Sequence, residues 1–103
     1  MGTGELRITA QTLKVLAILM SHRQAEVSGA EIARSTKLAS GTLYPILLRL
    51  EEAGWVESRW ESEDPHDLGR PRRRLYEVTG VGARKAQSAF RDVAVSLKEF
   101  AWR

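Results

Sequence analysis

The sequence predicts a mainly helical α+β fold, in which several helices are joined to one small β-hairpin. The helices are predicted from apolar residues that recur every three to four positions. The hairpin is predicted from two short segments of alternating polarity that enclose a turn-rich tip. The chain has 103 residues, of which 43% are hydrophobic and 28% charged, so we expect one globular domain with an ordinary core.

Composition excludes several classes of protein. The sequence has no cysteine, and therefore no disulfide, thiolate metal site or cysteine nucleophile. No apolar run approaches the roughly 18 residues of a membrane span, and the beginning of the chain lacks the pattern of a secretory signal. We therefore expect a cytoplasmic protein without a membrane partner. The net charge of +3 is by itself only weak evidence for a nucleic-acid partner.

The N-terminal part predicts an arm followed by a strongly apolar helix. Residues 1–8 show little periodicity, and we expect a flexible arm there. A helix is expected over residues 9–22, with Thr9 as its N-cap. Its middle is apolar on nearly every side, so the helix must be covered on two sides. The second side is covered either by the same chain or by a partner subunit. In the second case, Leu16 and Leu19 would lie at the dimer interface.

Two further helices are expected, joined by a tight turn at residues 38–39. Ser28 and Glu31 have the spacing of a capping box, which predicts a short helix that ends near Lys37. The segment Ser40–Gly54 has an apolar stripe at i, i+3, i+4 and i+7, and its glycine suits a helix end. Two helices joined by a short turn form a helix-turn-helix arrangement.

The start of the second of these helices depends on Pro45. If Ser40 is the N-cap, the proline lies inside the helix and one backbone hydrogen bond is lost. If Thr42 is the N-cap, the proline falls in the first turn, where its missing N–H costs little. We expect the earlier start, with a strained first turn.

A β-hairpin is expected directly after the helix-turn-helix. Residues 55–61 and 72–78 alternate in polarity, and the segment between them is rich in proline and glycine. Trp55 and Trp60 are expected to pack the hairpin against the helices. A hairpin in this position is a wing.

The C-terminal part predicts a helix from residue 80 onward, capped by Thr79. Its apolar residues are spaced 4, 3, 4 and 3 apart, which is the repeat of a helix–helix seam. They are Ala86, Phe90, Val93, Leu97 and Phe100. The helix either packs on its own domain or dimerises together with the first helix, and we expect the dimer. The expected organisation is an arm at 1–8, a winged helix-turn-helix at 9–79 and a dimerisation helix at 80–103.

Two motifs resemble the PadR-type family of winged-helix transcriptional regulators. GTLYPILLRLEEAGWVES, at Gly41–Ser58, is specific for that family, whereas GRPRRRLYEVTGVG, at Gly69–Gly82, is looser. The similarity covers about Leu6–Gln87, and the length suits the small subclass with a single C-terminal helix. The resemblance implies a dimeric repressor, in a family where some members release DNA on binding small aromatic or other hydrophobic compounds. Ala30 departs from the pattern, because an aromatic residue usually stands there.

The expected DNA-binding residues lie on the third helix, at its start and on the wing. They are Lys37, Ser40, Thr42, Tyr44, Pro45, Arg49, Arg70, Arg72 and Arg73. Hydroxyl and cationic groups can bind phosphates, and Thr or Pro can contact a thymine methyl. The alternative is that Tyr44 fills a gap in the core and Pro45 only fixes the turn.

The arginines of the wing also have two interpretations. They either follow phosphates or enter a minor groove, or they only keep an exposed hairpin soluble. Since alternate strand residues face opposite ways, all four arginines cannot point at DNA. Arg74 is expected either to lie inward or to pair with Glu57.

Other kinds of site receive little support. The resemblance implies an effector site between subunits lined by Phe90, Phe100 and Trp102, although these residues could simply pack an interface. The two histidines, His22 and His66, lack partners at the spacing of a convincing metal site, and no phosphate-binding glycine loop is present. We therefore expect no catalytic residue, no metal and no cofactor.

These observations together predict a sequence-specific regulator. We expect a homodimeric repressor that binds a pseudo-palindromic double-stranded DNA operator and is released by a small hydrophobic or aromatic effector. The alternative is a winged-helix protein–protein interaction module that does not bind DNA. Glu51 and Glu52 lie toward the far end of the third helix and the wing is rich in arginine, and both features favour DNA.

Overall fold

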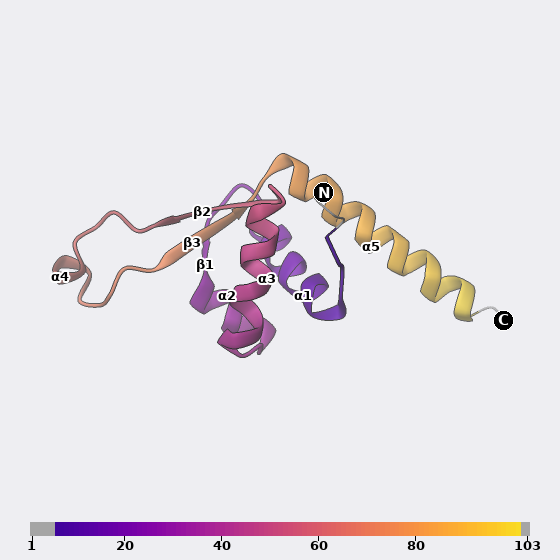
Figure 1. Cartoon of the computed structure of the whole chain (residues 1–103), viewed down its shortest axis with the longest axis horizontal. Helices are drawn as coiled ribbons and strands as arrows, with labels where there is room; N and C mark the ends of the chain where they lie inside the picture. The colour runs from indigo at the N-terminus through magenta and orange to yellow at the C-terminus, as the bar shows by residue number, and fades with distance from the viewer. Residues whose placement is uncertain (1–5, 102–103) are drawn as a thin grey trace.

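A helical body carries a hairpin on one side and a long helix on the other. A computed structural model describes residues 6–101. Its elements are α1 Ala10–Ser21, β1 Val27–Ser28, α2 Gly29–Thr36, α3 Ser40–Glu52, β2 Val56–Trp60, α4 Pro65–Leu68, β3 Arg74–Val78 and α5 Gly80–Ala101. Figure 1 shows the β2–β3 hairpin and α5 projecting from opposite sides of the body formed by α1, α2 and α3. The predicted mainly helical α+β class is confirmed, and Trp102 lies outside the described residues.

Helix α1 begins at the predicted cap and is buried within its own chain. The side chain of Thr9 accepts a hydrogen bond from the Thr12 amide at 3.1 Å. Leu16 and Leu19 are 0% and 1% exposed, and α1 contacts α2, α3, α5 and β3. The prediction that these two leucines lie at a dimer interface is therefore wrong, because the same chain already covers them.

Helix α2 has the predicted ends. The Glu31 amide donates to Ser28 Oγ at 3.1 Å, which is one half of the expected capping box. The Glu31 carboxylate does not complete the box, since its Oε2 lies 3.3 Å from His22 Nε2. Lys37 caps the C-terminus in the left-handed region, at φ 61°.

Helix α3 starts early, as expected, with Pro45 inside it. Ser40 is its first residue rather than its cap, and Ala39 takes the cap position without a side-chain hydrogen bond. The end of the helix is a Schellman motif, in which Gly54 adopts φ 80° and the amides of Gly54 and Trp55 donate to carbonyls in the last turn. The predicted stripe is buried and consists of Leu43, Ile46, Leu47 and Leu50.

The sheet has three antiparallel strands in the order β1-β3-β2, so the expected hairpin gains one strand. Strand β1 was not predicted, and its residue Val27 pairs with Tyr76 of β3. The alternation within the hairpin holds, because Val56, Ser58 and Trp60 pair with Val78, Tyr76 and Arg74. Trp55 packs against the core, but Trp60 is 59% exposed, so the prediction for Trp60 is wrong.

The tip of the hairpin contains a short helix that the sequence did not predict. Asp64 caps α4 by accepting a hydrogen bond from the His66 amide at 2.8 Å, and Pro65 is the first residue of the helix. Gly69 ends it with φ 69°. The turn-forming residues of the tip therefore build one helical turn.

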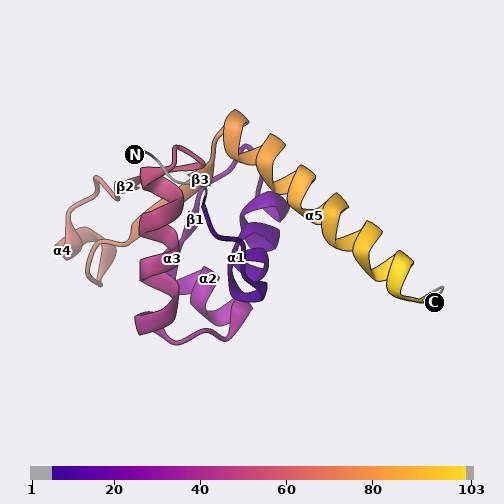
Figure 2. The same cartoon turned by 45° about the vertical axis from the view of Figure 1, so that its right-hand side comes forward.

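Helix α5 is held at its start by hydrogen bonds of Thr79, and its C-terminal half projects from the helical body. The Thr79 hydroxyl donates to the Gly54 carbonyl at 2.7 Å and accepts from the Gly82 amide at 3.0 Å. Ala83 and Ala86 are buried in the core, whereas residues 91–101 are exposed. Figure 2 shows α5 extending away from the side that carries the hairpin. Within residues 6–101, no helix is both long enough and apolar enough to cross a membrane.

Candidate nucleic-acid interface

One face of α3 is turned to solvent because the opposite face fills the core. Ser40, Tyr44, Pro45 and Arg49 are exposed on α3, and Thr42 is half-buried. Lys37, which precedes the helix, is also exposed. Leu48 is 57% exposed and was not assigned a role from the sequence. Its position three residues after Pro45 and four after Tyr44 places it on the same helix face.

Tyr44 lies partly in solvent and partly against α2. Its side chain is 41% exposed. A Cβ atom at Gly29 would come within 2.7 Å of the Tyr44 hydroxyl oxygen, so the ring rests directly on this glycine. The ring therefore packs against α2 while one side of it remains accessible.

Arg70 supports the tip of the wing. Its guanidinium donates two hydrogen bonds to the Glu61 carboxylate, at 2.7 and 3.0 Å. The same carboxylate accepts a hydrogen bond from the Arg73 amide at 2.8 Å. These hydrogen bonds, that from Arg70 first, lower the pKa of Glu61 to about 2, and the carboxylate raises the pKa of Arg70. Arg70 is therefore occupied in holding the two sides of the tip together.

Arg72 and Arg73 are the wing arginines that remain available. Both side chains are exposed. The Arg72 Nε atom donates to the backbone carbonyl of Glu63 at 2.9 Å, which leaves its charge uncompensated. In the described part of the chain, neither guanidinium forms an ion pair with a carboxylate.

Arg74 connects the wing to α3. One alternative predicted that Arg74 pairs with Glu57, and this pairing is not formed. Its Nε atom donates to Ser58 Oγ at 3.1 Å, and its Nη2 atom lies 3.9 Å from Glu51 Oε2. The Ser58 hydroxyl in turn donates to Glu51 Oε1 at 2.7 Å. The Arg74 guanidinium also stacks over the Trp60 ring, 5.2 Å from its centroid.

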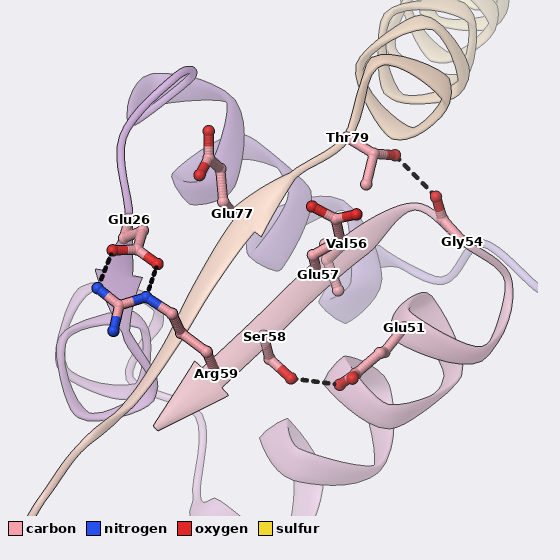
Figure 3. Close-up of a pocket in the computed structure, with 9 residues that line it drawn as sticks. All are labelled: Glu26, Glu51, Gly54, Val56, Glu57, Ser58, Arg59, Glu77 and Thr79. Carbon is pink, nitrogen blue, oxygen red and sulfur yellow. Dashed lines mark hydrogen bonds and ion pairs between the residues drawn. The ribbon is translucent and has the colours of Figure 1, made fainter. Parts of the chain in front are cut away.

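A hollow beside strands β2 and β3 has the opposite electrostatic character. It has a volume of about 510 Å³ and is lined by four glutamates, among them Glu26, Glu57 and Glu77. Figure 3 shows these side chains. Glu26 accepts two hydrogen bonds from Arg59, each 2.7 Å long, and these lower its pKa. Glu57 and Glu77 stand directly opposite each other on neighbouring strands. A polyanion is therefore disfavoured in this hollow.

The remaining residues predicted for dimerisation, together with Phe90 and Phe100 of the predicted effector site, lie along α5. Val93, Leu97 and Phe100 are 39%, 65% and 77% exposed, whereas Phe90 packs partly against the core. Phe90 and Phe100 are separated by about 15 Å along the helix axis, so a single chain does not bring them into one pocket. Among residues 6–101, no cluster of His, Asp and Glu could hold a metal ion.

A helix-turn-helix followed by a hairpin wing defines the winged helix-turn-helix class of protein. The sequence profile described as "Transcriptional regulator PadR-like family" matches residues 15–88. Since the match spans more than half of the chain, the chain belongs to the PadR-like family of transcriptional regulators. Among proteins with curated descriptions, none matches this sequence.

Several solved structures share the fold. A PadR family transcriptional regulator from Eggerthella lenta has 23% identity and a TM-score of 0.70, over 84% of this chain and 77% of that chain. A transcriptional regulator homologue from Pyrococcus horikoshii has 19% identity and a TM-score of 0.72, over 86% and 81%. The S. aureus MepR–DNA complex has 20% identity and a TM-score of 0.66, over 92% and 71%. At these identities the likeness establishes the fold, and the family assignment rests on the sequence profile.

Proposed function

We propose that the protein is a transcriptional regulator that binds double-stranded DNA through the exposed face of α3 and the wing. The observation that carries this proposal is that Tyr44 of α3 and the arginines Arg72 and Arg73 of the wing line one shared hollow. Helix α3 would enter the major groove, and the wing would reach the neighbouring groove. The similar fold of MepR, a protein solved in complex with DNA, supports this arrangement.

The proposed active form is a homodimer that acts as a repressor. Val93, Leu97 and Phe100 follow the spacing of a helix–helix seam and are exposed in a single chain, so pairing two α5 helices would remove apolar surface from water. Two α3 helices would then lie roughly 34 Å apart on a pseudo-palindromic operator. A small hydrophobic or aromatic effector would bind between the α5 helices, near Phe90 and Phe100, and favour a dimer that misses this spacing.

The test of DNA binding is a fluorescence anisotropy titration with a labelled duplex of the promoter region upstream of the gene, at several salt concentrations. We expect the logarithm of the association constant to fall linearly with the logarithm of salt concentration. The double variant Arg72→Ala/Arg73→Ala should reduce the slope by about 2, because about 0.9 counterion is released per phosphate contact. The matched control Arg84→Ala/Arg91→Ala removes the same charge from exposed positions of α5 and should keep the slope. Absence of binding at low salt would refute the proposal and favour a protein–protein module.

The dimer is tested by light scattering and by sedimentation. Leu97→Glu places a charge in the proposed seam and should convert the dimer to a monomer. Val95→Glu introduces the same charge on the same helix, at a residue that is 56% exposed but lies off the seam. The Val95 variant should remain dimeric. Equal behaviour of the two variants would contradict an interface along this seam.

A further inference from the structure

The hollow shared by α3 and the wing has a lining of one charge sign. It has a volume of about 410 Å³ and lies between the start of α2, the exposed face of α3 and strands β2 and β3. Its walls are formed by Gly29, Ala30, Tyr44, Trp60, Tyr76 and the three arginines at 72–74. Among residues 6–101, no carboxylate lines this hollow, in contrast to the hollow shown in Figure 3. An anionic group that also carries apolar surface fits such a lining.

Trp60 is the unexplained residue of this hollow. An indole that is 59% exposed near the end of a strand contributes little to the core and leaves a large apolar surface in water. Trp60 pairs across the strands with Arg74, on the same face of the hairpin as Ser58. Through Ser58 and Glu51 this face is bonded to α3, so the indole lies on the side of the wing that faces α3.

The Arg74 side chain lies over this indole. The Arg74 guanidinium stacks over the ring at 5.2 Å and is itself held by Ser58 and Glu51. Because Glu51 offsets part of the Arg74 charge, the uncompensated cations of the hollow are Arg72 and Arg73. The hollow therefore combines an aromatic wall, against which Arg74 packs, with two available guanidinium groups.

The geometry points to one occupant, a sugar–phosphate unit of the DNA backbone. If α3 lies in a major groove and the wing in the neighbouring groove, the strand that separates the two grooves must pass between them, across this hollow. We propose that Trp60 packs its indole against the deoxyribose of that strand, that Arg72 and Arg73 bind its phosphate, and that Arg74 is a positioning residue for the indole. This inference rests on the proposed function and adds Trp60 and Arg74 to it.

The experiment compares Trp60→Ala and Trp60→Phe with the wild type in the anisotropy titration at several salt concentrations. Trp60→Ala should weaken binding about tenfold, which corresponds to the loss of one well-packed aromatic contact, and should keep the salt slope because no charge is removed. Trp60→Phe should retain most of the affinity. Val81→Ala is the matched control, since Val81 is 44% exposed at the start of α5. It should bind as the wild type does.

The role of Arg74 is tested by the accessibility of the indole to acrylamide. The contribution of Trp60 is obtained as the difference in quenching between the wild type and Trp60→Phe. Arg74→Lys keeps the charge but loses the planar stack, so Trp60 should become more accessible in the free protein. Adding the duplex should protect Trp60 in the wild type.

The outcomes separate this inference from the proposed function. Suppose that the wild type binds the duplex, that Trp60→Ala binds equally well and that the indole is not protected. The proposed contact of Trp60 with the sugar–phosphate backbone is then refuted, while DNA binding stands. If the wild type does not bind, both fail. If benzoate, used as a small aromatic anion, protects Trp60 and the duplex does not, the hollow is a small-molecule site and the inference is overturned.

Discussion

The close contact between α5 and the backbone of Trp55 depends on the absence of a side chain at Gly82. A Cβ atom at this position would lie 2.0 Å from the Trp55 carbonyl oxygen and 2.7 Å from the Trp55 carbonyl carbon. These are backbone atoms, so no side-chain rotation can relieve the overlap. We therefore expect Gly82→Ala to destabilise the protein, although alanine is the better helix former.

The size of the effect follows from three terms. The two backbones would have to separate by at least about 1 Å, and overpacking of this kind costs about 1–3 kcal/mol. The same movement would disturb the Trp55 carbonyl, which accepts hydrogen bonds from the Thr79 amide at 2.9 Å and hydroxyl at 3.2 Å. One such bond contributes about 1 kcal/mol. The higher helix propensity of alanine offsets about 1 kcal/mol of this cost. The net decrease in the free energy of unfolding is therefore about 1–3 kcal/mol.

Urea denaturation followed by circular dichroism measures this loss, with Gly80→Ala as the control. Gly80 is the first residue of α5, and a Cβ atom there would meet only Arg84 Nη1, at the ordinary distance of 3.7 Å. Gly80→Ala should therefore be neutral, or stabilising by about 0.4–1 kcal/mol. Equal stability of the two variants would show that α5 does not approach Trp55 this closely and would refute the reasoning.

Three further predictions concern the core, the wing tip and the DNA face. Leu43→Ala, at a residue with 0% exposure, should cost about 2–5 kcal/mol in the same denaturation assay. The pKa of Glu61 is lowered in the folded state, so its contribution to stability is complete above its unfolded pKa of about 4.3 and is lost as the pH falls toward about 2. The melting temperature of Glu61→Gln should therefore vary less over this pH range than that of the wild type, and equal profiles would contradict the Arg70 pairing. Tyr44→Ala should weaken operator binding by more than about 1 kcal/mol, and unaltered binding would exclude Tyr44 from the DNA face.

Local interactions were the predictable part of this fold. The caps at Thr9 and Ser28 and the end of α3 at Gly54 depend on residues within one helical turn, so the sequence carries the signal. Strand β1 has two residues and forms only because Val27 meets Tyr76, nearly fifty positions later. An alternating pattern cannot appear in two residues, and β1 was therefore missed.

Contacts between elements were less predictable, for reasons that differ from residue to residue. The apolar residues all round α1 must be covered on more than one side, but the sequence could not say that elements of the same chain, α5 among them, cover this helix. Trp60 looked like a core residue because exposed indoles are uncommon. The pairing of Arg74 with Glu57 could have been excluded, because strand alternation places Arg74 beside Ser58 and Trp60, and Glu57 on the other face.

The segment Gly54–Trp55 connects the two ends of the molecule. It lies between the end of α3 and the first residue of β2, Val56, and supplies the two carbonyls that hold Thr79 at the start of α5. Because Gly82 leaves no space between α5 and Trp55, α5 cannot tilt toward the body without moving this segment. A tilt of α5 toward the body would therefore have to displace the end of α3 or the start of β2. In the proposed dimer, we expect such a tilt to move the DNA-binding face through Gly54 and Trp55.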